Sequence, residues 1–587
     1  MRVDVGSLEE LRAKGYLTGK IGSQPVCVFW HADCAYAIDD RCPHLGFPLH
    51  RGTVESGIVT CHWHHARFDL CTGGTLDPFA DDARAYPVDL AGGRVVVTAE
   101  PRPFDKDQTL RRLGEGLEEG LSLVLAKAVL AYSEAGEPLT DLLSVATGFG
   151  CTFRQQGFGP GLTVLCAMAN VLSSLDPEDR PLALVQGLNF LSGDTRGRPP
   201  RFALSPLAGE SMPSPERLGA WYRRFIENRS GDAAERALAS AVGGGASLQE
   251  LGRIMGAAAT DHVFLDEGHV LDFTNKAFEL VDHLGPASAA LVLPTLAHET
   301  ARATRHEEEG AWRHPDDLAA LCEEAATRLP AVLEAAGWDG SEGRGDEAAT
   351  FEEKGGPATL AWTVLEGGAA EIVEALLEAV SGGASAEQLG RAVALAAALR
   401  ITRFHVQNDH SDWNVVHHGF TTANALHQLL VRAPSPLLLR GVFQVALKVY
   451  LDRFLNVPAA RLPDEPRGDL DELAACWDVE GRVDEAGRLA YGFLRGGGSR
   501  EALLAALGHG LLAEDAGFHW FQTYEAAARQ AAAWPRGSEE EALILAGTAR
   551  FLAAHTPTRR ELSQVVRIAS RLRRGEALYE EAELPSL

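Results

Sequence analysis

The sequence has little cysteine for its length and no long apolar segment. Its 587 residues include 9 cysteines, and neither their number nor their spacing suggests a disulfide framework. Apolar stretches such as residues 121–131, which Lys127 interrupts, fall short of the roughly 18 residues that span a bilayer. Charged residues also interrupt residues 1–17, so no signal-peptide pattern is present. We therefore expect a cytoplasmic protein without a membrane segment.

Positive charge is scarce as well. The chain has 54 Lys and Arg residues against 81 Asp and Glu residues, a formal net charge of −27 at pH 7. This balance argues against nucleic acid and anionic membranes as partners. A glycine-rich dinucleotide loop after a strand is also missing, since the Gly157–Gly161 segment has neither the spacing nor the context. We expect NAD(P)H and flavin to act on a separate reductase.

Two short cysteine and histidine motifs stand near the start of the chain. Cys42-Pro43-His44 has the pattern C-x-H, and Cys61-His62-Trp63-His64 has the pattern C-x-x-H. Two thiolates can hold one iron, while two neutral imidazoles hold a second iron and raise the reduction potential of the cluster. A zinc ribbon is the alternative, but zinc sites usually pair cysteines as C-x-x-C. The pattern predicts a 2Fe-2S cluster with the ligands Cys42, His44, Cys61 and His64.

The residues around these motifs resemble the two ligand loops of Rieske ferredoxins and of the ferredoxin domains of Rieske oxygenases. The resemblance covers about residues 1–105 and rests on Cys42-Pro43-His44-Leu45-Gly46 and His64-His65-Ala66-Arg67-Phe68-Asp69. It implies that the two cysteines bind one iron and that His44 and His64 bind the other.

The chain departs from the family pattern in two places. His62 and His65 stand where the family usually has Pro and Gly, and we expect these histidines and His50 to lie at the surface or behind the ligands. Phe47 and Trp63 stand where high-potential Rieske proteins carry cysteines that form a disulfide. This difference favours the ferredoxin type, with a low to middle potential.

The pattern changes from strands to helices after the first hundred residues. Short strands are predicted at residues 25–30, 35–39, 57–61 and 94–98. A charged linker with two prolines follows at residues 99–107, and after it Ala, Leu and Glu recur at helical spacing. We predict a multidomain α and β protein, with a small Rieske β-sandwich at residues 1–105 fused to a large all-α domain at residues 106–587.

The helical region contains internal repeats. Residues 245–253 return as residues 383–391 and, more weakly, as residues 498–504. Each copy is followed by a break rich in His and Asp and then by a helix that begins near an aromatic residue, at Phe273, Phe420 and Phe521. Such self-similarity predicts a stacked helical array. The units run approximately over residues 120–232, 233–368, 369–490 and 491–587.

The breaks between repeated helices hold most of the remaining histidines. Equivalent positions of stacked repeats line one surface, so we expect the breaks to converge in a His-rich pocket, and the third break contributes His509 and His519. Histidine with carboxylate suits a non-haem iron. The alternative is that these histidines cap helices and satisfy the backbone at turns. The candidate ligands are His262, Asp266, His269, His405, His410 and His417.

His417 and His418 are adjacent in one of these breaks. Neighbouring residues on a helix point about 100 degrees apart, so we expect one of them, His417, to face inward. The segment Asn414–Phe420 also resembles the His-x-Gly-Tyr segment of the questin-oxidase-like family, helical enzymes that oxidise polycyclic aromatic substrates. Asp266-x-x-His269 begins the iron motif of ordinary Rieske oxygenases but does not complete it.

Two functional hypotheses follow. The first is an iron-sulfur oxidoreductase, an oxygenase in which an NAD(P)H-dependent flavin reductase or another donor reduces the cluster. The cluster then passes electrons to the His-rich site, with non-haem iron as the candidate second cofactor and a small organic, aromatic substrate. The second is an electron carrier or redox sensor whose helical region is a scaffold for protein interaction.

Overall fold

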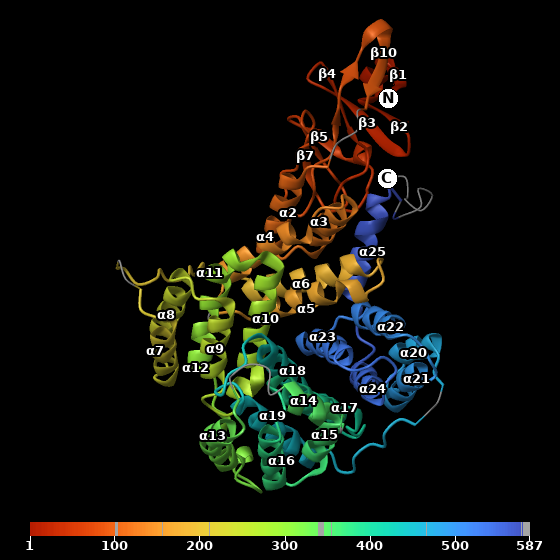
Figure 1. The fold of residues 1–587 in the computed structure, drawn as a ribbon. Coiled ribbons are helices and arrows are strands. Elements are labelled where there is room, and N and C mark those ends of the chain that lie inside the picture. The colour runs from red at the N-terminus through yellow and green to blue at the C-terminus, as the bar shows by residue number, and fades with distance from the viewer. Residues whose placement is uncertain are drawn as a thin grey trace. The chain divides into compact units, whose positions relative to one another are not determined.

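The computed structural model describes residues 1–99, 104–154, 157–209, 212–338, 345–353, 355–464, 467–576 and 578. The chain folds into two compact units, of which the first comprises residues 1–145 and 561–587 and the second residues 146–560 (Figure 1). Residues 100–103 of the predicted linker lie outside the described residues. The next helix begins at Lys106.

The strands of the first unit form three small antiparallel sheets, with the orders β1-β10-β9, β2-β3-β4-β8 and β5-β6-β7. The four predicted strands correspond to β3, β4, β6 and β10, which confirms the β-rich N-terminal domain. The strands are β1 (Arg2–Ser7), β2 (Tyr16–Ile21), β3 (Gln24–His31), β4 (Cys34–Asp39), β5 (Thr53–Glu55), β6 (Ile58–Thr60), β7 (Arg67–Asp69), β8 (Ala85–Tyr86), β9 (Val88–Asp89) and β10 (Arg94–Thr98).

Strand β3 separates two apolar cores. Side chains alternate between the faces of a strand, so Val26 and Val28 enter one core while Cys27 and Phe29 enter the other. The second of these cores also contains the two predicted cysteine ligands. One face of β3 therefore packs against the two loops that carry the cysteine and histidine motifs.

Helices make up the rest of the described structure, as predicted for an all-α region. They are α1 (Leu8–Lys14), α2 (Lys106–Glu119), α3 (Ser122–Glu134), α4 (Leu139–Thr152), α5 (Pro160–Val171), α6 (Arg180–Thr195), α7 (Pro215–Glu227), α8 (Gly231–Gly243), α9 (Leu248–Ala259), α10 (His269–Leu284), α11 (Ala289–Val292), α12 (Ala297–Arg302), α13 (Leu318–Ala335), α14 (Gly345–Glu353), α15 (Gly356–Glu366), α16 (Ala369–Ser381), α17 (Ala386–Thr402), α18 (His410–Arg432), α19 (Arg440–Leu451), α20 (Leu470–Ala475), α21 (Val483–Arg495), α22 (Arg500–Ala513), α23 (Phe518–Ala532), α24 (Glu539–Ala553) and α25 (Glu561–Arg573).

The three related sequence segments begin helices in the same way. Ser247, Ser385 and Ser499 are the N-cap residues of α9, α17 and α22, and each side chain accepts a backbone N–H from the first turn. Such a cap stabilises a helix by about 1 kcal/mol. The next long helices after the breaks are α10, α18 and α23.

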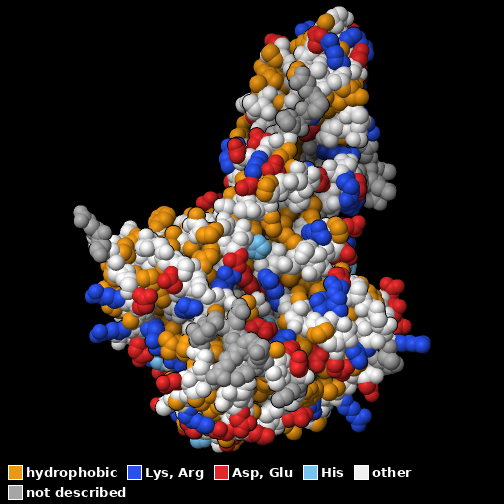
Figure 2. All heavy atoms as spheres, in the orientation of Figure 1, with side chains coloured by type: hydrophobic (Ala, Val, Ile, Leu, Met, Phe, Trp, Pro, Cys, Tyr) orange, Lys and Arg blue, Asp and Glu red, His pale blue; other side chains and the backbone are white. Residues whose placement is uncertain are grey.

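The surface carries charges of both signs. On the face drawn in Figure 2, Lys and Arg side chains are interspersed with Asp and Glu side chains. None of the described helices combines the length and the apolar character needed to cross a membrane.

Candidate metal centres

Two loops of the first unit share a backbone geometry and carry the four predicted cluster ligands. The N–H of Gly46 donates to the carbonyl of Cys42 at 2.7 Å, and the N–H of His65 donates to the carbonyl of Cys61 at 3.0 Å. Gly46 and His65 also share a left-handed conformation, with φ of 82° and 61°. For a residue with a side chain this conformation costs roughly 1 to 2 kcal/mol. His65 therefore occupies a position that suits glycine.

The four predicted ligand side chains lie close together in two pairs. Cys42 and Cys61 are buried, and a hydrogen bond between their thiols lowers the pKa of Cys61 to about 6 while it raises that of Cys42. The rings of His44 and His64 lie 4.8 Å apart, edge to face. Burial lowers the pKa of His44 to about 4, and its buried Nδ1 has no hydrogen-bond partner within the described structure. Two close thiols and a neutral imidazole with a free nitrogen fit a 2Fe-2S cluster.

Aromatic residues occupy the positions of the absent disulfide. The ring centroids of Phe47 and Trp63 lie 6.0 Å apart, so the two loops touch through these side chains. The Trp63 ring also lies 5.0 Å from that of His64, and 45% of Trp63 is exposed.

The neighbouring histidines have other partners. His62 shares a hydrogen bond of 2.6 Å with the hydroxyl of Thr53. The Nδ1 of His50 lies 2.8 Å from the carboxylate of Asp40. Both imidazoles are thus held by groups outside the set of four.

A second group of histidines converges in the second unit. One ring nitrogen from each of His269, His418 and His519 is within 4.8 Å of the others. His269 and His519 lie in the first turns of α10 and α23, whereas His418 lies further along α18. The Nε2 atoms of His418 and His519 are 3.2 Å apart. The ring of His417 lies 4.3 Å from that of His519. We call these four residues the histidine cluster.

The surroundings hold most of this cluster in the neutral form. Burial lowers the pKa of His269 and of His519 to about 3, and it holds the pKa of His417 well below its usual range. Glu267 lies 2.9 Å from the Nδ1 of His418, and this hydrogen bond lowers the pKa of Glu267 to about 2. Within the described structure, the buried Nδ1 of His269 and Nε2 of His417 have no hydrogen-bond partner. Uncharged imidazoles with free nitrogens are metal ligands.

Buried polar residues continue along the same helices. Asp272, one turn after His269, accepts a hydrogen bond of 2.8 Å from Gln522. Burial raises the pKa of Asp272 to about 7. The ammonium of Lys276 pairs with Glu279 and Glu525, each at 2.7 Å. These groups form a hydrogen-bonded layer behind the cluster.

A cavity adjoins the cluster on another side. The ring of Phe273 stacks on that of His269 at 5.3 Å and also lines a cavity of about 220 Å³. Phe158 contributes a second aromatic wall, and Arg154 and Arg198 contribute cations. One phenyl ring therefore contacts both the cavity and a cluster imidazole.

Comparison with known proteins identifies the first domain. A profile of the Rieske 2Fe-2S domain matches residues 1–87. The anthranilate 1,2-dioxygenase ferredoxin subunit of Burkholderia cepacia is 31% identical over 94 residues, which cover 16% of this chain and 87% of that protein. The chain belongs to the Rieske 2Fe-2S family. Its Rieske domain implies a 2Fe-2S cluster.

Other relatives of this Rieske protein also match only part of it. Apoptosis-inducing factor 3 of Mus musculus is 31% identical over 163 residues, and the match covers 25% of this chain and 25% of that relative. The chain thus spans about a quarter of the length of this relative. The solved ferredoxin of carbazole 1,9a-dioxygenase from Nocardioides aromaticivorans IC177 is 28% identical, with 17% of this chain and 99% of that chain covered and a TM-score of 0.16.

Of the six residues predicted for a second site in this Rieske protein, the structure brings His269 and His417 into the histidine cluster. His262 lies instead between Glu227 and Glu307, 2.6 Å from each carboxylate. This pairing holds the His262 imidazole between two acidic groups outside the cluster.

The other three predicted residues also lie outside the cluster. The carboxylate of Asp266 accepts a hydrogen bond of 3.4 Å from Thr304. His405 is half-buried and accepts the N–H of Gln407, while His410 is exposed. Asp266 and His405 stand in the breaks, and His410 is the first residue of α18, eight residues before His418. The converging histidines lie within α10, α18 and α23.

His418 and His519 also belong to the site, although the sequence places them in the breaks and they are not among the six candidate ligands. Both stand two residues before the phenylalanine that recurs in the repeats, in His418-Gly419-Phe420 and His519-Trp520-Phe521. An alignment of the second and third repeats on this phenylalanine therefore points to these two histidines. The expectation that a helix begins near Phe420 is wrong, because α18 begins at His410.

The expectation that only one histidine of the adjacent pair faces inward is wrong, because His418 is buried as well as His417. His417 is 0% and His418 is 6% exposed. Helix α18 is covered on two sides, because the Nδ1 of His417 contacts the Thr523 hydroxyl of α23 at 2.8 Å while His418 contacts Glu267, just before α10.

Proposed function

We propose that this chain is an iron-sulfur oxidoreductase of the oxygenase class. In this proposal Cys42, His44, Cys61 and His64 hold the 2Fe-2S cluster of the Rieske domain. A non-haem iron in the helical unit receives its electrons. The ligands proposed for that iron are His269, His418 and His519.

The observation that carries the proposal is the convergence of three ring nitrogens within 4.8 Å. His418 is buried and His269 and His519 are half-buried, and imidazoles facing one another in such a place cost free energy unless they share a partner. Imidazole suits iron, copper, nickel and zinc, and of these a redox-active metal is the kind that a Rieske cluster can serve. A bound non-haem iron would supply one-electron chemistry with dioxygen.

The residues around the cluster have defined roles in this proposal. Glu267 accepts from the Nδ1 of His418 and so fixes the ring with its Nε2 towards the centre. The Thr523 hydroxyl orients His417 in the same manner. Phe273 packs against His269 and limits the access of water from the adjoining cavity.

The cavity beside Phe273 is the proposed substrate site. Its volume of about 220 Å³ and its aromatic walls suit a small organic, aromatic molecule. Arg154 and Arg198 line this cavity together with Asp194 and Glu299, so a substrate would meet charged groups of both signs.

The relatives support the direction of electron flow. The Burkholderia relative is named as the ferredoxin subunit of a dioxygenase. By analogy, the partner that reduces this chain is an NAD(P)H-dependent flavin reductase or another electron donor. A carrier and an acceptor fused in one chain meet at an effective concentration on the order of millimolar.

Iron and acid-labile sulfide, measured in the same purified protein, test this function. A 2Fe-2S cluster contributes equal amounts of both, so a second iron site gives an excess of iron over sulfide. The variant with His418→Ala and His519→Ala should return the two to equality. Equal iron and sulfide in the unaltered protein, with no other redox metal, would favour an electron carrier with a helical interaction scaffold.

Substrate-dependent oxidation tests the enzymatic part. The reduced cluster should be reoxidised by dioxygen faster when a suitable aromatic compound is present. The double variant should lose that dependence and keep the visible spectrum of the cluster.

A further inference from the structure

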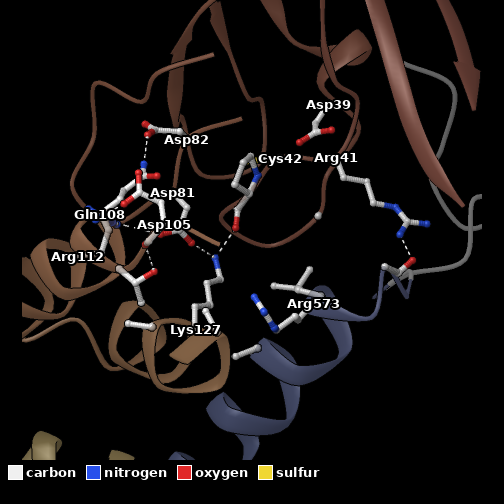
Figure 3. Close-up of a pocket in the computed structure, with 18 of the residues that line it drawn as sticks. Asp39, Arg41, Cys42, Asp81, Asp82, Asp105, Gln108, Arg112, Lys127 and Arg573 are labelled. Atoms are coloured by element: carbon white, nitrogen blue, oxygen red, sulfur yellow. Dashed lines mark hydrogen bonds and ion pairs between the residues drawn. The ribbon is translucent and has the colours of Figure 1, made fainter. Parts of the chain in front are cut away.

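Three helices beyond the matched Rieske residues line a cavity together with the first ligand loop. Helices α2, α3 and α25 belong to the same compact unit as the Rieske domain, although α25 lies more than 400 residues further along the chain. Residues of these helices and of the loop, including Cys42, Pro43 and Gly46, line one cavity of about 510 Å³ (Figure 3). A Cβ built on Gly46 would lie 3.1 Å from the Leu572 side chain of α25, so the contact is close.

Lys127, in helix α3, extends across the cavity and contacts the first ligand loop. Its ammonium donates to the carbonyl of Pro43 and, at 3.2 Å, to the carbonyl of His44. It also forms an ion pair of 3.0 Å with Asp81, and 15% of its side chain is exposed. Figure 3 shows Lys127 between Asp81 and the backbone of the loop.

Asp81 has a second cationic partner. Arg112 of α2 lies 3.2 Å from its other carboxylate oxygen and donates to the carbonyls of Pro78 and Ala80. The carboxylate is therefore held in place even without Lys127. Two opposite charges, one of them bonded directly to the ligand loop, stand beside the cluster site.

We propose that Lys127 is a positioning residue that holds the Pro43–His44 segment and raises the reduction potential of the Rieske cluster, and that Asp81 moderates this effect. Reduction adds one negative charge to the cluster. A half-buried cation nearby stabilises the reduced form, and a nearby anion destabilises it. The Lys127 ammonium contacts the loop that carries two of the ligands. Its charge is therefore closer to the cluster, and less screened by solvent, than the charge of a surface lysine.

The two charges provide a test with opposite signs. Lys127→Met should lower the midpoint potential in a spectroelectrochemical titration of the full-length holoprotein, and Asp81→Asn should raise it. Lys127→Arg keeps the charge and a donor, so its potential should stay nearer to that of the unaltered protein. Loosening of the loop by itself does not predict opposite shifts.

Arg573→Met is the matched control. Arg573 lines the same cavity and is cationic, but its guanidinium donates to Glu134 rather than to the ligand loop. Its replacement should shift the potential less than Lys127→Met does. The visible and electron paramagnetic resonance spectra report whether each variant retains the cluster.

The proposal is overturned if Lys127→Met retains the cluster at an unchanged potential, or if Lys127→Met and Asp81→Asn shift the potential in the same direction. If Lys127→Met loses the cluster, Lys127→Gln retains a hydrogen-bond donor without the charge. In that case the midpoint potentials of Lys127→Gln and Asp81→Asn are compared, and the proposal requires that they shift in opposite directions.

Discussion

The Nε2 atoms of His418 and His519 lie 3.2 Å apart, although the two residues are separated by 101 positions in the chain. The Nδ1 of His418 faces Glu267, so in a neutral ring the proton resides on Nδ1 and the lone pair on Nε2. His519 can then either donate a proton to that lone pair or share a metal ion with it. The proposed function takes the second option, and within the described structure the Nδ1 of His269 and the Nε2 of His417 have no hydrogen-bond partner.

Replacement of one histidine should empty this second site alone. We expect His519→Ala to lose the metal that is not accompanied by sulfide and to keep the visible spectrum of the 2Fe-2S cluster. His262→Gln is the control, since His262 pairs with Glu227 and Glu307. Elemental analysis and absorption spectra check both. Full retention of the second metal in His519→Ala would contradict the ligand assignment.

The ligands of the Rieske cluster can be separated from their neighbours. His64→Ala should remove or convert the cluster, because one iron would lose a ligand. His62→Ala should retain it, since the His62 ring bonds to Thr53. A spectrum unchanged by His64→Ala would refute the assignment.

The left-handed residue in the second loop offers a gain in stability. His65→Gly removes a strain of roughly 1 to 2 kcal/mol and adds roughly 0.5 to 1 kcal/mol of backbone entropy to the unfolded chain. We expect a net stabilisation of up to about 1.5 kcal/mol, measured from the denaturant midpoint of cluster loss. Ala66→Gly, at the next residue, which lacks a positive φ, should destabilise the protein. The same sign for both variants would argue against strain at His65.

Asp272 should make the stability of the second unit depend on pH. Its folded pKa of about 7 lies above the unfolded value of about 3.9, so the native state binds more protons between these values. Its contribution is fully present below about pH 4 and is lost as the pH rises to about 7, at roughly 1.4 kcal/mol per pKa unit.

The variant Asp272→Asn cannot ionise at this position, so it should not lose stability as the pH rises towards 7. In chemical unfolding of metal-free protein, the variant should gain on the unaltered protein as the pH is raised from 5 to 8. A stability difference that is constant over this range would show that Asp272 does not titrate there.

The cluster should have a potential in the lower part of the Rieske range of about −150 to +300 mV. Phe47 and Trp63 pack where the high-potential type has its disulfide, and this favours the ferredoxin type. A midpoint above about +150 mV in a redox titration would disagree with this expectation.

Local signals in the sequence predicted the β-rich and all-α parts and the family. Strand alternation around Val26–Phe29 and the serine caps of α9, α17 and α22 depend on neighbouring residues, so they can be read from sequence. The convergence of His269 with His519 depends on how α10, α18 and α23 pack. Histidines in the breaks, such as His262 and His405, share the composition of the site but lie outside the helices that converge. Helix α25 contacts the first ligand loop although more than 500 residues separate them in the chain. No pattern of spacing in the sequence predicts such a contact.

Anomalous diffraction at the iron absorption edge, from crystals of the full-length protein, tests the central claim most directly. We predict one peak at the loops of Cys42, His44, Cys61 and His64 and a second within bonding distance of His269, His418 and His519. A map with the first peak and none at the histidine cluster would contradict the proposed oxygenase site.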